Sequence, residues 1–429
     1  MRRSGLLALV ASLIMVAGCA TATLLPNGRV LILSLVAKTY DPVAGRVVNS
    51  AQPPTMRLMA TATALDNGLV LIVGGASGMA TGFSLGGSDE PARPQTYASA
   101  DLYDPATDTY TPTGSMAHPR TFHTATLLAD GRVLIVGGGE SGSSSGTTGP
   151  ATPQVVPPPE LYDPATGTFG PTAGDTVAPH VLATATRLQD GRVLIAGGVT
   201  ADLNAGTASA SPAPNPSGAP TTKAELFDPA TGMFTATGPM TTARVWHTAT
   251  LLQDGRVLIV GGTANPNMDT SGAAPADPTL MTAEIYDPAS GTFSPTGGPA
   301  NPRFAHTASI LDDGRVLVVG GIDTAAQGAG ADPFIRAAEL FDASTGTFAA
   351  TGDMVEGQLF PTSTLLQSGQ VLLVGLGASA MSGAAGAAGS SGDPLSSAQL
   401  YDPATGTFSP VEVEPAVLPS SSPGAGLFG

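Results

Sequence analysis

The chain has 429 residues, of which only 12% are charged, and it is rich in glycine (55) and proline (38), with a formal net charge of −16. Because nucleic-acid binding requires a basic surface, this acidic balance argues against a nucleic-acid partner. Cys19 is the only cysteine, so no intramolecular disulfide can form.

Residues 1–18 have the features of an export signal. Two arginines precede an apolar stretch over 6–17, which is too short to span a bilayer. The stretch ends in V-A-G-C, with the cysteine at Cys19, and this resembles the lipobox of bacterial lipoproteins. The resemblance implies an exported protein, acylated on Cys19 and anchored by that lipid to a bacterial membrane, and Ala20 at the next position would permit sorting to the outer membrane. The alternative is an ordinary secretory signal with an incidental cysteine.

Two phrases, close to G-R-V-L-I-V-G-G and Y-D-P-A-T-G-T-F, recur seven times in the rest of the chain. Each aspartate of the second phrase is followed after 27 or 28 residues by the next G-R-V glycine, whereas the step from glycine to aspartate varies from 13 to 37. Paired strands cannot change length without losing register, but surface loops can. The spacing therefore predicts a repeat architecture with one variable loop in each unit. The glycines are Gly28, Gly68, Gly131, Gly191, Gly255, Gly314 and Gly369, and the aspartates are Asp41, Asp104, Asp163, Asp228, Asp287, Asp342 and Asp402.

Each unit reads as two hairpins and hence as four short antiparallel strands. In 124–136, two apolar runs flank Asp130-Gly131, which is a strong hairpin signal. In 161–169, the sequence D-P-A-T-G suits a turn that ends in a left-handed glycine. The first unit is degenerate, because it lacks the Gly-Gly pair. Either residues 20–27 act as a tether and the first unit is incomplete, or the face that carries the variable loops sits close to the membrane.

A lone four-stranded sheet cannot bury both apolar faces, but seven packed radially can, which predicts an all-β, seven-bladed propeller. An open solenoid is the structural alternative. The Gly-Gly pair, the Tyr-Asp-Pro, the aromatic residue of the fourth strand and an Arg-x-x-His before the first strand resemble those of kelch-repeat β-propellers, in the galactose-oxidase-like superfamily. We therefore expect a signal over 1–18, a propeller over 19–414 and a disordered tail over 415–429.

The long loops between second and third strands are expected to gather on one face, which we call the loop face. The Arg-x-x-His segments enter the first strands there and should line the central channel. Three imidazoles at equivalent positions could bind a metal, but they stand on blades three, five and six and need not converge, so a structural role is favoured. Trp246 could stack on a sugar ring or pack between blades. The predicted loops are 76–100, 139–159, 199–223, 263–282, 322–337 and 377–397, and the candidate ligand-binding residues are Arg120, His123, Arg244, Trp246, His247, Arg303 and His306.

The kelch resemblance also bears on enzymatic function. Galactose oxidase and its relatives are copper radical enzymes that use a tyrosine cross-linked to a cysteine. The sole cysteine of this chain, Cys19, lies in the signal, so that cofactor cannot form. We expect no catalytic residue, no cofactor and no metal, and hence a binding or scaffolding module rather than an enzyme, with a protein or polysaccharide of the cell envelope as its partner. The alternatives are a carbohydrate-acting or metal-dependent enzyme that uses the three histidines, and a purely structural envelope protein.

Overall fold

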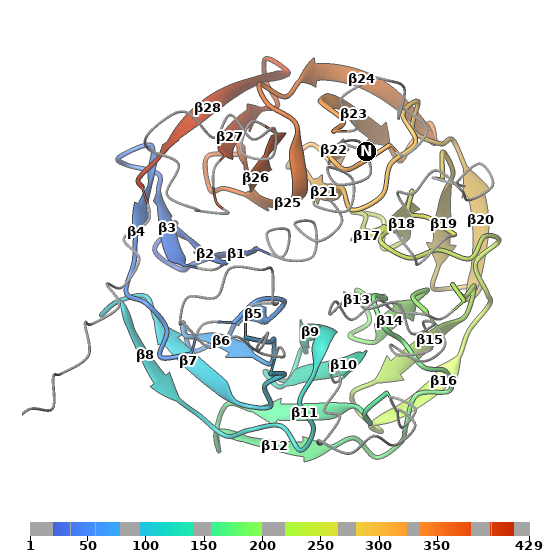
Figure 1. The fold of residues 1–429 in the computed structure, drawn as a ribbon. Coiled ribbons are helices and arrows are strands. Elements are labelled where there is room, and N and C mark those ends of the chain that lie inside the picture. Colours follow the sequence, from blue (N-terminus) through green and yellow to red (C-terminus); the bar gives the residue numbers. More distant parts are fainter. Residues whose placement is uncertain are drawn as a thin grey trace, which may run out of the picture.

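Seven four-stranded units form a closed ring in the computed structural model (Figure 1). The structure describes 20–34, 36–55, 57–77, 95–139, 156–199, 219–264, 280–323, 334–378, 395 and 397–415. The predicted signal, Cys19, the central parts of the six long loops and tail residues 416–429 lie outside these ranges. Within them, no helix is long and apolar enough to cross a membrane.

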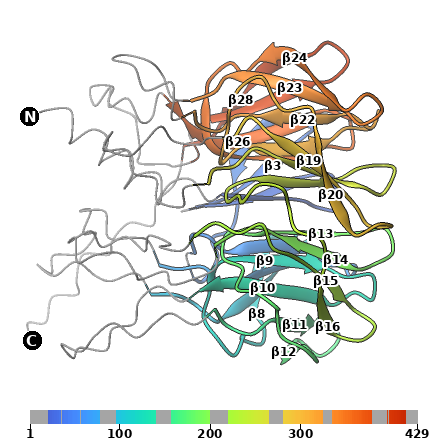
Figure 2. The same cartoon turned by 90° about the vertical axis from the view of Figure 1, so that its right-hand side faces the viewer.

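Each blade is built from four strands that follow one another in the chain, and seen from the side they run between the two faces of the ring (Figure 2). Blades one and two contain β1 (Thr21–Leu24), β2 (Val30–Leu33), β3 (Ala37–Asp41), β4 (Arg46–Asn49), β5 (Thr61–Ala64), β6 (Val70–Val73), β7 (Ala100–Asp104) and β8 (Thr109–Pro112). Blades three and four contain β9 (Thr121–Leu127), β10 (Val133–Gly139), β11 (Glu160–Asp163), β12 (Thr168–Pro171), β13 (Thr184–Arg187), β14 (Val193–Ala196), β15 (Ala224–Asp228) and β16 (Met233–Ala236).

The same order continues around the ring. Blades five and six contain β17 (Thr248–Leu251), β18 (Val257–Val260), β19 (Ala283–Asp287), β20 (Thr292–Thr296), β21 (Thr307–Ile310), β22 (Val316–Val319), β23 (Ala337–Asp342) and β24 (Thr347–Asp353). Blade seven contains β25 (Gln358–Leu365), β26 (Val371–Gly377), β27 (Ser397–Asp402) and β28 (Thr407–Val413). The prediction of an all-β, seven-bladed kelch-like propeller is confirmed.

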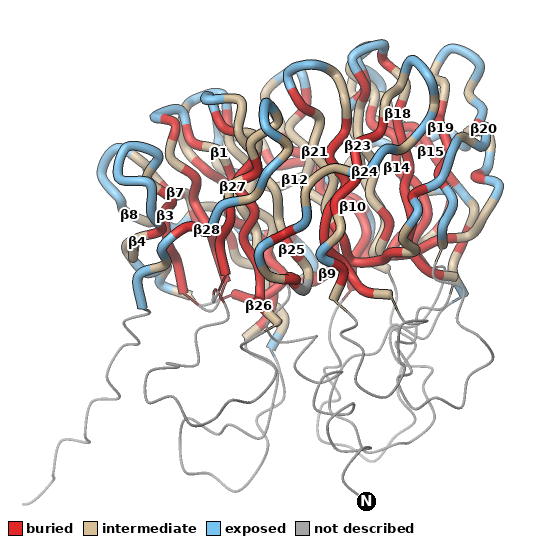
Figure 3. The backbone as a smooth tube through the Cα atoms, turned by 90° about the horizontal axis from the view of Figure 1, so that it is seen from above, coloured by how far each residue is buried: buried red, intermediate tan, exposed pale blue. Residues whose placement is uncertain are grey.

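The hydrophobic core lies between neighbouring blades. Every residue of β10 is buried, as its continuous apolar sequence predicts for a strand covered on both faces. Leu134 and Val136 of this strand pack with Val193 and Ile195 of the next blade. The exposed residues are concentrated in the turns along one edge of the ring (Figure 3). Because each blade completes its core only against its neighbours, the ring depends on every junction.

The ring closes where blade one meets blade seven. Their outer strands pair in parallel, with Glu412 opposite Arg46 and Val413 opposite Val47. The buried Lys38 side chain also donates to the backbone carbonyl of Glu414. Blade one is complete, since β1 forms four residue pairs with β2. Residues 21–24 are therefore part of the propeller, which excludes the first alternative for this segment, a tether over 20–27.

Candidate ligand site at the loop face

The three predicted arginines are completely buried and join strand ends within their own blades. In blade five, Arg244 Nη2 donates to Glu284 Oε1 over 2.6 Å, and Nη1 donates to the Gly261 carbonyl over 2.7 Å. The other carboxylate oxygen of Glu284 accepts the backbone N–H of Thr241. A buried ion pair needs such additional hydrogen bonds to offset its desolvation. The equivalent pairs are Arg120 with Glu160 (2.8 Å) and Arg303 with Glu339 (2.7 Å).

Other blades fill the same position with different polar pairs. Arg57 meets Asp101 in blade two at 2.8 Å, and His180 meets Glu225 in blade four at 2.6 Å. In blade seven, Gln358 donates to the carbonyl and hydroxyl oxygens of Ser397. In six blades, the residue at the arginine position therefore has a structural role, because it joins strands within its own blade.

The three predicted histidines connect neighbouring blades. Each Nε2 lies within hydrogen-bond distance of a threonine hydroxyl in the preceding blade: His123 to Thr61 (3.0 Å), His247 to Thr184 (3.1 Å) and His306 to Thr248 (3.0 Å). Burial, with a smaller effect of the neighbouring arginine, lowers the pKa of His123 and of His247 to about 3. The pKa of His306 is also lowered well below its ordinary value. All three imidazoles are therefore neutral at physiological pH.

The Gly-Gly pair makes room for these histidines. A Cβ atom on Gly74, which has a φ of +67°, would lie only 2.6 Å from His123 Cε1 of the next blade. The following residue, Gly75, donates its N–H to the carbonyl of Arg120 over 2.9 Å. The Gly-Gly pair of one blade thus packs against the Arg-x-x-His segment of the next blade.

The described side chains offer few groupings of metal ligands. No group of three or more His, Cys, Asp or Glu side chains that could hold a metal exists in the part of the chain that the structure describes. The imidazoles of His247 and His306, which line the same pocket, each use Nε2 for a threonine hydroxyl, and each Nδ1 is buried without a partner among the described residues. Copper in proteins is held by several nitrogen, sulfur or oxygen donors. The described residues do not fit a copper centre.

Apolar residues occupy one equivalent position in six blades, at the loop-face ends of the first strands. The residue before each histidine position has a φ between 45° and 60°, a conformation that is costly for residues other than glycine. Its recurrence in six blades shows that the fold imposes it. Trp246 lies 6.1 Å from Phe122 and 5.2 Å from Phe360, measured between ring centroids. We call these six residues the mouth ring: Met59, Phe122, Leu182, Trp246, Ala305 and Phe360.

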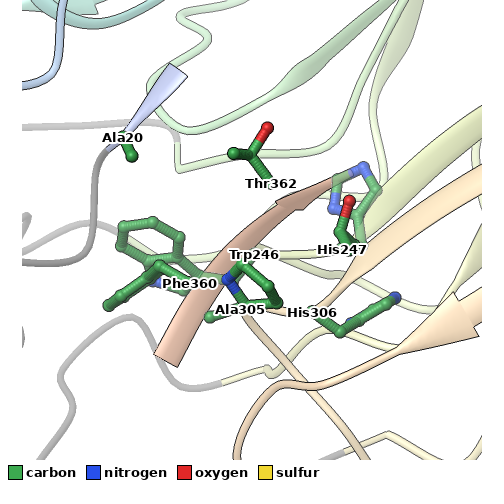
Figure 4. A pocket seen from close by; sticks show the side chains of 9 residues that line it. Ala20, Trp246, His247, Ala305, His306, Phe360 and Thr362 are labelled. Carbon is green, nitrogen blue, oxygen red and sulfur yellow. The ribbon is translucent and has the colours of Figure 1, made fainter. Parts of the chain in front are cut away.

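An open pocket of about 250 Å³ lies within the mouth ring, beside Trp246 and Phe360 (Figure 4). His247 and His306 form part of its wall, together with the hydroxyl-bearing Thr307 and Thr362. The remaining lining residues are Ala20, Ala305 and Pro361.

The structure divides the predicted site residues into two groups. Trp246, His247 and His306 line the pocket, whereas His123 and the three arginines do not. Ligand binding stays a prediction for all seven, and among them only Trp246, His247 and His306 border the pocket. Sequence reasoning missed Phe360, which stands in Q-L-F-P where a complete unit has Arg-x-x-His. Aligning that degenerate segment with the one that contains Trp246 would have identified it.

Two solved structures share this architecture. A fungal alcohol oxidase described as having catalytic diversity among the AA5 family, in complex with copper, is 17% identical, with 85% of this chain and 71% of that chain covered and a TM-score of 0.60. YjhT is 14% identical, with 78% and 96% covered and a TM-score of 0.51. The chain is a kelch-like β-propeller. No family model and no curated protein matches it.

The prediction that the chain is not an enzyme is wrong. It is contradicted by the likeness to the alcohol oxidase, in which the same propeller fold supports an oxidase. The prediction relied on one missing cofactor, the cysteine-linked tyrosine, but a fold can support other chemistries through different side chains. At this sequence identity the likeness shows the fold alone, so neither the substrate nor the copper of that enzyme transfers to this chain.

Proposed function

We propose that the protein recognises a carbohydrate in the pocket of the mouth ring. The observation that carries the proposal is the placement of Trp246 and Phe360 beside the hydroxyl groups of Thr307 and Thr362. An aromatic face packs against the C–H groups of a sugar ring, and nearby hydroxyls exchange hydrogen bonds with its polar rim. The indole Nε1 is buried and has no hydrogen-bond partner within the described ranges, so it offers a further donor after a small rotation.

The size of the pocket limits the ligand. Its volume of about 250 Å³ lies just below the range of about 300–1,000 Å³ that is typical of small-molecule sites. One sugar unit fits such a volume, and because the pocket is open, the rest of a glycan can continue outside it. We therefore propose that a terminal or branching unit of a polysaccharide is bound.

Export and anchoring belong to the same proposal. The apolar stretch over 6–17 and the lipobox-like sequence that ends at Cys19 support placement at a bacterial cell envelope. A polysaccharide or protein of that envelope is then the partner that the loop face meets.

An enzyme that acts on the bound carbohydrate is the second candidate. The fold shared with an alcohol oxidase supports it. In the pocket, the imidazoles of His247 and His306 are the groups able to accept or donate a proton, and both are neutral. Among the described residues, the two imidazoles rather than a copper centre would carry the chemistry of this candidate.

The test is a titration of the full chain with a panel of envelope oligosaccharides. Binding is measured by calorimetry and by the fluorescence of Trp246, the only tryptophan. Trp246→Ala should weaken binding about tenfold, since aromatic contacts contribute on the order of 1 kcal/mol beyond burial. Phe169→Leu, in the outer strand of blade three, is the matched control and should bind normally. The same mixtures are assayed for sugar cleavage or oxidation, and turnover that Trp246→Ala abolishes would favour the enzyme. No binding across the panel would refute recognition of these sugars.

A further inference from the structure

The pocket is built from equivalent sequence positions of neighbouring blades. These positions are the mouth-ring residue, the residue after it, which is histidine in three blades, and the threonine that follows. Blades six and seven contribute all three, as residues 305–307 and 360–362, and blade five contributes residues 246–247 (Figure 4). In blade one, Ala20 stands at the second position, directly before Thr21. We call this second position the histidine position, and its occupant in each of these blades helps to shape the pocket.

The histidine position has no histidine in the last and first blades. Pro361 stands there in blade seven and Ala20 in blade one. In the three histidine blades, the imidazole bonds to a threonine hydroxyl of the preceding blade, as His306 does with Thr248 over 3.0 Å. Proline has no side-chain donor or acceptor, so the equivalent hydroxyl of blade six, that of Thr307, is not taken by an imidazole. Thr307 lies instead on the wall of the pocket.

The Thr307 hydroxyl keeps hydrogen-bonding capacity for a ligand. Its oxygen lies 2.6 Å from the hydroxyl oxygen of Ser363 in the next blade, which is also 2.6 Å from that of Ser309. A hydroxyl has one donor and two acceptor sites, so this contact does not saturate Thr307. The pocket wall therefore offers a hydroxyl at the place where a histidine junction would consume it.

The first strand of blade seven is irregular at the same point. The register of β25 with β26 shifts between Leu359 and Thr362, where two residues of β25 oppose one of β26. Such a β-bulge redirects side chains and often lies beside a functional site. Pro361 stands in the bulge, and proline suits it because it has no N–H to lose from the ladder. The bulge thus coincides with the residues through which blade seven reaches the pocket.

The preceding blade keeps the space that an imidazole would need. A Cβ atom on Gly261 of blade five would lie 3.0 Å from His306 Cε1. At the equivalent position of blade six, a Cβ atom on Gly320 would lie 2.7 Å from Pro361 Cγ. Since Gly320 is a glycine, a histidine in place of Pro361 can pack against it and reach the Thr307 hydroxyl. The packing of this junction is therefore compatible with histidine, although proline is present.

We infer that Pro361 is a specificity-determining residue of the pocket. The inference rests on the proposed recognition of a carbohydrate and identifies the residue that limits what the site accepts. Proline presents C–H groups to the ligand and leaves the Thr307 hydroxyl open, whereas histidine would occupy both that hydroxyl and part of the space. The pocket accordingly selects a sugar unit that places a hydroxyl at Thr307 beside an apolar C–H edge at Pro361.

Calorimetry with the oligosaccharide of the panel that binds most tightly tests this role. Pro361→His should weaken binding at least about tenfold, because it fills space and removes a hydrogen-bonding group from the ligand. Pro361→Ala removes the apolar wall but leaves Thr307 open, so it should lose only about threefold. The matched control is Ala60→His with Ser34→Gly, which places a histidine at the same position of blade two, outside the pocket lining, and should bind normally.

A second measurement needs no ligand. Urea unfolding of Pro361→His, Thr307→Val and the combined variant gives the coupling between the two positions. We expect a favourable coupling of about fivefold in the unfolding equilibrium constant, because the imidazole bonds to the hydroxyl. No coupling would mean that the imidazole does not reach Thr307, and a Pro361→His protein that fails to fold would mean that the junction rejects histidine. Either result overturns the inference.

The binding data separate this inference from the proposed function. A ligand that binds wild type and Pro361→His equally well refutes the role of Pro361 and leaves carbohydrate recognition standing. Equal losses for Pro361→His and Pro361→Ala also refute it, since the open hydroxyl would then contribute nothing. A panel in which no sugar binds the wild type refutes the proposed function, and the role of Pro361 with it.

Discussion

Blade junctions with and without a histidine occur in the same ring. Between blades two and three, His123 fits against Gly74 and bonds to Thr61. Between blades one and two, Ala60 stands at the histidine position and Ser34 at the glycine position. The hydroxyl Oγ1 of Thr21, equivalent to that of Thr61, is buried there without a hydrogen-bond partner in the described residues.

Histidine and glycine meet across three junctions, although glycine is also kept at Gly320, which lies opposite Pro361. A serine at position 34 has a Cβ where the imidazole would lie, so the two replacements suit each other. The three junctions with histidine gain a side-chain hydrogen bond, worth about 1 kcal/mol each when buried and formed between neutral groups. The junction between blades one and two lacks this contribution, while its buried arginine, Arg57, is retained.

The largest expected effect is the response of the three histidine junctions to pH. In the folded state the pKa of His123 and of His247 is about 3, below the unfolded value of about 6.5. At a pH between these two pKa values, each histidine is protonated in the unfolded chain but not in the folded chain. The free energy of unfolding therefore falls as the pH decreases through this window. Between pH 7 and pH 5 the loss is up to about 2 kcal/mol for each histidine.

Thermal unfolding at pH 7, 6 and 5 measures this loss. A variant with His123→Gln, His247→Gln and His306→Gln keeps a polar group at each junction and should be less stable at pH 7 but much less sensitive to pH. Equal pH sensitivity of the two proteins would show that the junction histidines are not responsible.

The next prediction asks whether the buried arginine, which acts within a blade, stabilises the protein independently of the histidine, which acts across a junction. Arg244→Leu removes one partner of a buried ion pair and leaves Glu284 uncompensated, which should cost about 3–5 kcal/mol. Arg57→Leu should cost a similar amount, although Ala60 replaces histidine in that segment. The control is Arg132→Leu in an exposed pair with Asp130, with an expected cost below about 1 kcal/mol. Urea unfolding measures all three, and a much smaller cost for Arg57 would mean that the arginine depends on the histidine.

Gly197→Ala tests whether a histidine junction excludes a side chain on the preceding blade. Its Cβ would lie 2.6 Å from His247 Cε1 and 2.7 Å from the Arg244 carbonyl oxygen. Gly45 is the matched control, since its φ of +65° is close to the +68° of Gly197 and no atom lies within 4 Å of a Cβ there. Gly45→Ala should cost about 1–2 kcal/mol for the left-handed backbone alone. Gly197→Ala should cost about 1–3 kcal/mol more because of the overlap. Equal melting temperatures of the two variants would contradict a tight junction.

The strands of the propeller were predictable because their signals are local. Asp130-Gly131 does join β9 to β10, and the apolar run after it is buried. The role of Arg244 was not predictable in the same way, because its partner Glu284 is 40 residues distant in the sequence and burial is a property of the whole ring. Ring closure by β28 and β4 was also missed, since it joins the fourth strands of the first and last units, which lie at opposite ends of the sequence. Of the two aromatic residues beside the pocket, Trp246 was predicted from the sequence and Phe360 was not.

The smallest effect, and the most specific, comes from rebuilding a histidine junction between blades one and two. Ala60→His alone should destabilise the protein, because the ring would meet the side chain of Ser34. Combined with Ser34→Gly, it should recover stability, since the imidazole can then reach the unpartnered Thr21 hydroxyl. A double-mutant cycle measured by urea unfolding should give a favourable coupling energy of about 1 kcal/mol. Additive effects of the two substitutions would mean that glycine and histidine recur together for separate reasons, and the contrast between junctions with and without a histidine would lose its physical basis.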